Sequence, residues 1–180
     1  MEKAKAFLKE FFAQWKQVVF QPQAYFENME VNGFGKPAYF LITCLALSWA
    51  FNGVLKIFLA LTTDFLISYV VKGLIFSAFI SVAAIAVLLI TIPIQYFTGK
   101  QLGSTADFER CFWVGSFACA PLLLSFIPYA GILTAVYGLA LLFVGIKINH
   151  QLPLPKTILV FLSVFLTLVV VGLLRYYVSG

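Results

Sequence analysis

The chain has 180 residues, of which 62% are hydrophobic and 11% are charged, and its formal net charge is +5. Soluble domains carry about one charged residue in four, so this composition excludes a soluble globular protein. No nucleic-acid-binding motif accompanies the positive charge, and we expect no nucleic-acid partner. The basic residues suit the anionic head groups of membrane lipids.

The first predicted element is an amphipathic helix in the segment 1–36. Apolar and aromatic side chains recur there every three or four residues, and lysines and glutamines lie opposite. Such a helix is suited to the membrane interface, although it can also pack on a helix bundle as ordinary structure. The residues predicted to contact the lipid interface are Phe7, Lys9, Phe11, Phe12, Trp15 and Lys16. Pro22 ends this helix and lies in the first turn of a second, short helix over Gln21–Asn28.

Uncharged stretches indicate membrane spans in the rest of the chain. A hydrocarbon core of roughly 30 Å needs about 20 apolar residues in a helix. The stretch 111–146 holds no charge but is too long for one helix, and Pro128 and Gly131 predict a turn near its middle. The predicted fold is therefore all-α, with five transmembrane helices in a domain over residues 37–180. The predicted spans are Pro37–Leu61, Gly73–Thr98, Phe108–Ile127, Ala130–Asn149 and Pro155–Val178.

The distribution of lysine and arginine predicts the orientation of the five spans. Nine of these residues fall on one side of the membrane if the N-terminus is cytoplasmic, and Lys56, Lys72 and Arg175 fall on the other. Cytoplasmic loops carry an excess of basic residues. We therefore expect a cytoplasmic N-terminus and a C-terminus outside.

The sequence carries no fingerprint of catalysis or of a cofactor. Cys44, Cys111 and Cys119 have no paired spacing, so we interpret them as small hydrophobic residues rather than as a metal site. No hydrolase, zinc-protease, P-loop or dinucleotide motif occurs. We expect no enzymatic activity, no cofactor and no metal.

One set of polar residues is predicted to meet at the cytoplasmic ends of the spans, where ion pairs would hold the loops in place. Partner docking is the alternative. Asp107 also suits a helix start, because an acid complements the positive end of the helix dipole. The predicted cluster comprises Lys100, Asp107, Glu109, Arg110, Lys147 and His150. We interpret the single histidine as an interfacial hydrogen-bonding residue rather than as a metal ligand or a base.

A second set of residues would line a cavity if the protein transports a small solute. Prolines inside spans free backbone carbonyls, although membrane helices also tolerate them as simple kinks. The predicted cavity residues are Asn52, Pro93, Gln95 and Pro121.

Several segments together resemble the Yip family of Ypt/Rab-interacting membrane proteins. They are Gln21–Met29, Gly33–Pro37, Lys100–Phe108, Phe117–Pro121, Ile127–Pro128 with Gly131, and Gly145–Pro153. The resemblance implies a five-span bundle with a cytoplasmic N-terminus. Only about 36 residues precede the first predicted span, which is similar to the short prokaryotic members. It therefore implies a prokaryotic cytoplasmic membrane, and no Rab-type GTPase partner is expected.

Three functions remain open at this point. The first is a non-enzymatic membrane protein that organises the bilayer or scaffolds a protein partner, which the sequence does not identify. The second is a small-solute transporter or channel, and the third is a membrane-embedded enzyme, which would need the charged cluster to converge on one cleft. Membrane lipids are the expected partners. Small residues at four-residue spacing, such as Ala46 with Ala50, permit a homo-oligomer or close packing inside one protomer.

Overall fold

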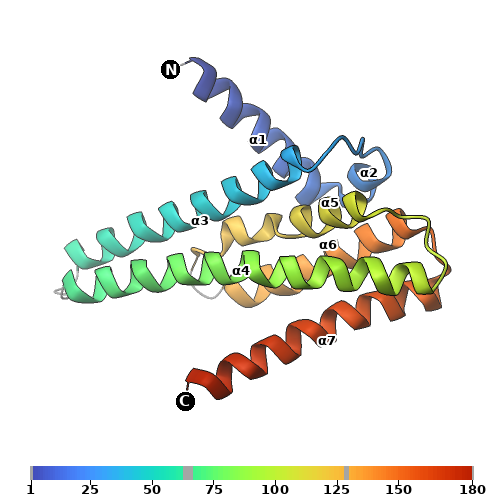
Figure 1. Cartoon of the computed structure of the whole chain (residues 1–180). Coiled ribbons are helices and arrows are strands. Elements are labelled where there is room, and N and C mark those ends of the chain that lie inside the picture. The colour runs from blue at the N-terminus through green and yellow to red at the C-terminus, as the bar shows by residue number, and fades with distance from the viewer. Residues whose placement is uncertain (1, 63–66, 128–129, 180) are drawn as a thin grey trace.

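The structure is a computed structural model that describes residues 2–62, 67–127 and 130–179, and every regular element in these ranges is a helix. The elements are α1 (Glu2–Phe20), α2 (Pro22–Glu27), α3 (Gly35–Thr62), α4 (Ile67–Gln101), α5 (Phe108–Ala118), the 3-10 helix η1 (Ala120–Leu124), α6 (Ala130–His150) and α7 (Leu154–Ser179). Figure 1 shows their arrangement.

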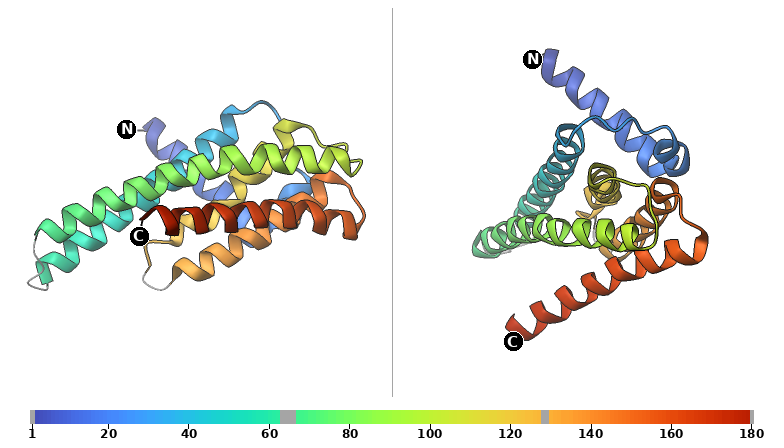
Figure 2. Two further views of the ribbon diagram at one scale, coloured as in Figure 1. Left: turned by 60° about the horizontal axis from the view of Figure 1, so that its bottom comes forward. Right: turned by 45° about the vertical axis from the view of Figure 1, so that its right-hand side comes forward.

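The long helices α3, α4, α6 and α7 surround the shorter α5, which lies in the middle of the bundle (Figure 2). We call the end of the bundle where α4 and α6 finish, and where α5 and α7 begin, the α2 end, because α2 lies there (Figure 1). Helix α1 crosses the outside of the bundle obliquely. Helix α7 packs on α4 near the α2 end and diverges from it toward the C-terminus, as both figures show.

Three helices among the described residues are long and apolar enough to cross a membrane. They are Gly35–Phe58, Ala130–His150 and Leu154–Val171. They coincide with the first, fourth and fifth predicted spans. Helix α4, with 35 residues, covers the second predicted span. These elements confirm an all-helical protein with helices that can span a membrane, whereas a count of five crossings stays a prediction.

The third predicted span differs from the prediction, because it is a broken helix rather than a continuous one. Helix α5 ends at Ala118 after 11 residues, and η1 continues to Leu124. Pro121 explains the break, since proline lacks an N–H and its ring clashes with the carbonyl four residues earlier in an α-helix. At 1.5 Å per residue, α5 alone is about 16 Å long, which is too short for the hydrocarbon core.

The short N-terminal helices agree with the sequence prediction. Helix α1 ends at Phe20, and α2 begins at Pro22, which occupies the first turn. Proline suits this position because backbone N–H groups in the first turn of a helix have no acceptor within the helix. The N–H that proline lacks therefore costs no hydrogen bond. The predicted turn near Pro128 lies outside the described residues.

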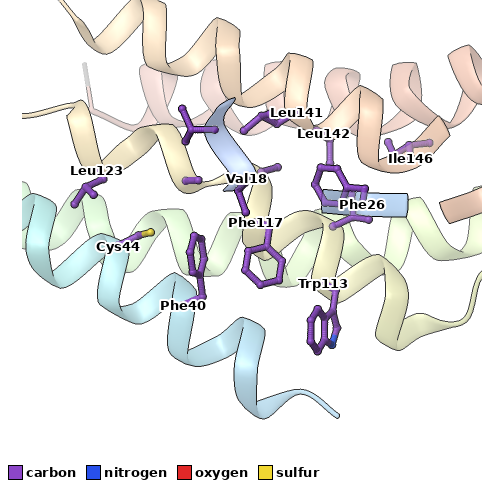
Figure 3. Close-up of a cluster of buried hydrophobic side chains, with 14 of the residues drawn as sticks. Val18, Phe26, Phe40, Cys44, Trp113, Phe117, Leu123, Leu141, Leu142 and Ile146 are labelled. Carbon is purple, nitrogen blue, oxygen red and sulfur yellow. The ribbon is translucent and has the colours of Figure 1, made fainter. Parts of the chain in front are cut away.

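The largest group of buried apolar side chains is centred on Phe117 of α5 (Figure 3). The Phe117 ring contacts Phe40 of α3, Tyr25 of α2 and Trp113, with ring centroids 4.5, 5.1 and 5.6 Å apart. Val18 of α1 belongs to the same core and is fully buried. Helix α2 and the buried side of α1 are therefore part of the core, although α1 itself crosses the outside of the bundle.

Helices α5 and α6 approach each other closely at Gly145. A Cβ atom placed on Gly145 would lie 2.6 Å from Cγ1 of Val114 and 3.2 Å from Cζ of Phe26. Both neighbours are buried, so neither can move aside without disturbing the core. Glycine is required here because the facing side chains already fill the space that a larger residue would need.

Candidate functional site

Helix α1 is fixed to the bundle by its C-terminal half. The indole N–H of Trp15 donates to the carbonyl oxygen of Ala120 at 2.8 Å, and the Tyr137 hydroxyl donates to the carbonyl of Val19. Phe11 is buried and packs against Phe40 with ring centroids 5.4 Å apart. Of the residues predicted to contact lipid, Phe11 and Trp15 therefore have partners inside the protein.

The free edge of α1 carries apolar side chains next to lysines. At 100° per residue, Leu8 and Phe12 fall between the buried side of the helix and a sector that holds three of its four lysines. Their side chains are 40% and 41% exposed. Phe7 is exposed to the same degree but its ring also contacts Tyr39 at 5.9 Å. The exposed lysines of this sector are Lys5, Lys9 and Lys16.

The opposite edge of α1 is polar and faces a groove. Two adjoining hollows of about 540 and 420 Å³ lie between α1, α2 and the start of α3, and they share Gln14, Gln17, Tyr25 and Lys36. The Gln14 amide donates to the Tyr25 hydroxyl at 2.8 Å. Burial raises the pKa of Tyr25, and this hydrogen bond opposes the rise. The tyrosine is therefore a neutral phenol at physiological pH.

The charged residues predicted to form one cluster have separate roles at the α2 end. The Asp107 carboxylate accepts from the backbone N–H of Arg110 at 2.8 Å and caps α5, as predicted. The Glu109 carboxylate accepts from the backbone N–H of Gly33, and the Lys100 ammonium lies 5.7 Å from the Tyr96 ring centroid. Among the described residues, both carboxylates therefore accept hydrogen bonds from backbone amides. Lys147 is exposed in the last turn of α6, where it complements the helix dipole.

Replacing Asp107 with alanine should destabilise the folded protein by about 1 kcal/mol, because the first turn of α5 loses its side-chain cap. Thermal unfolding of the purified protein in detergent measures this change. Asp107→Asn is the matched control, since asparagine caps helices about as well and should restore most of the loss. Equal midpoints for the alanine variant and the wild type would contradict the capping role.

Unlike the other residues of the predicted charged cluster, His150 lies in the interior of the bundle, where its side chain is 1% exposed. Its Nε2 atom lies 3.2 Å from the amide nitrogen of Gln95 and 3.7 Å from Sγ of Cys111. These three residues come from α6, α4 and α5. We call them the buried polar cluster. Gln95 was predicted to line a cavity, and His150 was predicted to belong to the charged cluster. Cys111 was predicted to be a simple hydrophobic residue.

The Gln95 amide nitrogen lies within hydrogen-bond distance of Nε2 of the histidine ring, and an amide nitrogen can only donate. With this orientation of the amide, the neutral ring carries its proton on Nδ1. Nδ1 is buried, has no hydrogen-bond partner among the described residues and lies against Gly99. A buried polar atom without a partner costs about 1–3 kcal/mol, which the close packing of this ring must offset. The spacing of Gln95 and Gly99, one helical turn apart on α4, is the sequence signal that would have pointed here.

A cavity of about 560 Å³ lies beside this cluster, between α4, α5, α6 and α7. Its walls are mainly aliphatic, with the polar side chains of Thr91, Gln95 and Thr134 among them. Gln95 is the only member of the predicted cavity set in these walls, since the described lining does not include Asn52, Pro93 or Pro121. The bundle therefore holds a largely apolar cavity that is open to the surface and has an amide at its wall.

Comparison with known proteins identifies one family. The Yip1 domain model matches residues 16–175. No curated protein and no solved structure matches the chain. The matched region runs from Lys16, near the end of α1, to Arg175 in α7. It includes Val18 and Val19, the buried polar cluster and the cavity, whereas Phe11 and Trp15 lie before it. The chain belongs to the Yip family of membrane proteins.

Proposed function

We propose that this protein is a non-enzymatic membrane protein that organises the bilayer at its cytoplasmic surface and uses α1 as its contact with the lipid head groups. A scaffold for a protein partner is part of the same proposal. The expected partners are membrane lipids and, as a further possibility for the same surface, an unidentified protein or a second copy of the chain.

The proposed topology has five crossings. Helix α5 and η1 together form the third crossing, because 11 α-helical and five 3-10 residues extend about 26 Å at 1.5 and 2.0 Å per residue. This passage is buried among the other helices, where a break in the backbone is tolerated in a membrane. The excess of basic residues on one side supports a cytoplasmic N-terminus and an outer C-terminus. A prokaryotic cytoplasmic membrane is the proposed location.

The observation that carries the proposal is the division of α1 into three sides. One side packs into the bundle, a second carries polar side chains and faces the groove, and the third presents Leu8 and Phe12 beside exposed lysines. An apolar edge bordered by lysines binds at the boundary between acyl chains and anionic head groups. Because Trp15 and Val18 hold the helix against the bundle, this edge keeps a fixed position relative to the spans.

The test replaces the exposed apolar edge. The double substitution Leu8→Ser and Phe12→Ser should abolish the effect of the protein on membrane shape, because α1 then lacks the side chains that enter the lipid. The full chain is reconstituted into vesicles that contain phosphatidylglycerol, and cryo-electron microscopy measures vesicle diameter and tubule formation.

The matched control is Ala6→Ser with Ala13→Ser, which introduces the same number of serines on the exposed, non-apolar side of α1. This control should behave as the wild type. If the Leu8 and Phe12 variant reshapes vesicles as the wild type does while inserting normally, α1 is not the organising element. If the wild type leaves the vesicles unchanged, the proposed function itself is wrong.

Transport is the second candidate, since a cavity with a buried amide lies inside the bundle. A polar solute needs several hydrogen-bonding groups along its path. Thr91 and Thr134 instead bond to the carbonyls of Leu88 and Gly131 in their own helices, at 3.3 and 2.9 Å. The aliphatic walls favour an apolar occupant, and the membrane-organising function is therefore placed first.

A further inference from the structure

The cavity between α4, α5, α6 and α7 has the size and composition of a ligand site. Its volume of about 560 Å³ falls within the range of roughly 300–1,000 Å³ that is typical of small-molecule sites. Such sites combine apolar walls with a few fixed polar groups. Here the walls are aliphatic, and Gln95 supplies an amide that is 1% exposed.

Water is a poor occupant of this space. A buried water needs two to four polar partners, and the hydroxyl protons of Thr91 and Thr134 are already donated within their own helices, so Gln95 is left as the main donor in the walls. An empty cavity of this size would deprive its walls of dispersion contacts. An apolar cavity of roughly 150 Å³ is known to take up hydrocarbon, so a larger one in a membrane protein calls for a hydrocarbon occupant.

The cavity is continuous with the surface that faces lipid. On α7, the wall residues Phe165 and Val169 are each followed by an exposed apolar residue, Leu166 and Val170, which are 59% and 52% exposed. Helix α7 also diverges from α4 toward its C-terminus (Figure 2). Acyl chains of the surrounding bilayer therefore lie next to the cavity without a protein layer between them.

Gln95 defines a polar position in the cavity wall. Its amide makes one side-chain hydrogen bond among the described residues, to His150, and uses one N–H for it. A glutamine amide offers a second N–H and a carbonyl oxygen. Polar groups at membrane depth usually mark a ligand or a path for one, because leaving them unpaired in hydrocarbon is costly. The ester carbonyl of a phospholipid is an acceptor that matches the remaining N–H.

We propose that this cavity binds one acyl chain of a membrane phospholipid, with the ester end of the chain at Gln95. This site is separate from the surface of α1 that carries the proposed function, so either can be correct without the other. The bound chain would complete the packing of α7 against α4 and α6.

The test fills the cavity and measures retained lipid. Ala135 lines the cavity on α6, and Ala140 is exposed on the same helix about 140° around its axis, outside the lining. The full chain is released from phosphatidylglycerol nanodiscs and weighed by native mass spectrometry. We expect one tightly held phospholipid in the wild type and in Ala140→Trp, and at least a tenfold smaller bound fraction in Ala135→Trp. Equal retention by the two tryptophan variants, or none in the wild type, would overturn the proposal.

A second variant keeps the proposal testable if Ala135→Trp does not fold. Gln95→Leu keeps a similar side-chain volume and removes the amide, so it should weaken lipid retention roughly two- to tenfold, as the loss of one hydrogen bond predicts. Added phosphatidylglycerol should also raise the thermal midpoint of the delipidated wild type more than that of Gln95→Leu. Retention and midpoint shifts equal to those of the wild type would show that Gln95 does not contact the lipid.

Discussion

Replacing Phe117 with alanine is expected to destabilise the folded bundle by about 2–4 kcal/mol, the largest effect of any single truncation considered for this chain. The Phe117 ring is fully buried beside Phe40 and Trp113 (Figure 3) and also contacts Tyr25. In a membrane the unfolded side chain is surrounded by lipid, so little transfer free energy is lost. The cavity left among these rings accounts for most of the cost.

The measurement is equilibrium unfolding in mixed micelles at increasing dodecyl sulfate, followed by tryptophan fluorescence. Phe97→Ala is the matched control, because that phenyl ring is 63% exposed on α4 and its removal creates no internal cavity. We expect the control to lower the free energy of unfolding by less than about 1 kcal/mol. Similar losses for both variants would mean that the aromatic cluster does not hold α2, α3 and α5 together.

Gly99→Ala is expected to displace the His150 ring and to destabilise the protein by about 1–3 kcal/mol. A Cβ atom at this position would lie 2.5 Å from Nδ1 and 2.6 Å from Cε1 of His150. The ring cannot rotate away without losing its contact with Gln95. His150 is the only histidine in the chain, so its imidazole gives a single, unambiguous NMR signal that reports the displacement directly.

Gly131→Ala provides the control for Gly99→Ala, since no atom of the described residues lies within 4 Å of a Cβ atom at Gly131. This variant should leave the imidazole signal unchanged and should gain up to about 1 kcal/mol from the higher helix propensity of alanine. In the Gly99→Ala background, His150→Ala should lower the free energy of unfolding by less than it does in the wild type, because the steric conflict disappears with the ring. An unchanged imidazole signal in Gly99→Ala would show that the two residues are not in contact.

The sequence predicted the elements of this protein well because lipid-facing helices leave a strong signal. Long uncharged stretches placed α3, α6 and α7 within a few residues of their observed bounds, and Pro22 marked the junction of α1 and α2. Asp107 was predicted as a helix start and caps α5. These features depend on local chemistry, namely hydrophobicity over about 20 residues, proline geometry and capping.

The contacts between helices were not predictable in the same way. In uniformly apolar helices the pattern of side chains does not show which face meets a neighbour, because both lipid and protein accept aliphatic groups. The sequence therefore did not reveal that Gln95, Cys111 and His150 meet, although they are far apart in the chain. It also treated α5 and η1 as one continuous span, since a proline in a membrane helix is compatible with either a kink or a break.

The hydrogen bonds that hold α1 constrain the order in which the chain assembles during synthesis. Trp15 and its acceptor Ala120 are 105 residues apart, and Val19 and Tyr137 are 118 apart. A ribosome makes about 5–20 residues per second, so α1 waits for several seconds before either partner exists. During that time α2 and α3 can already cover part of its apolar side, since Phe11 packs on Phe40, but Trp15 and Val19 lack these two partners. If α1 contacts the bilayer as proposed, it would do so first and close onto the finished helices afterwards.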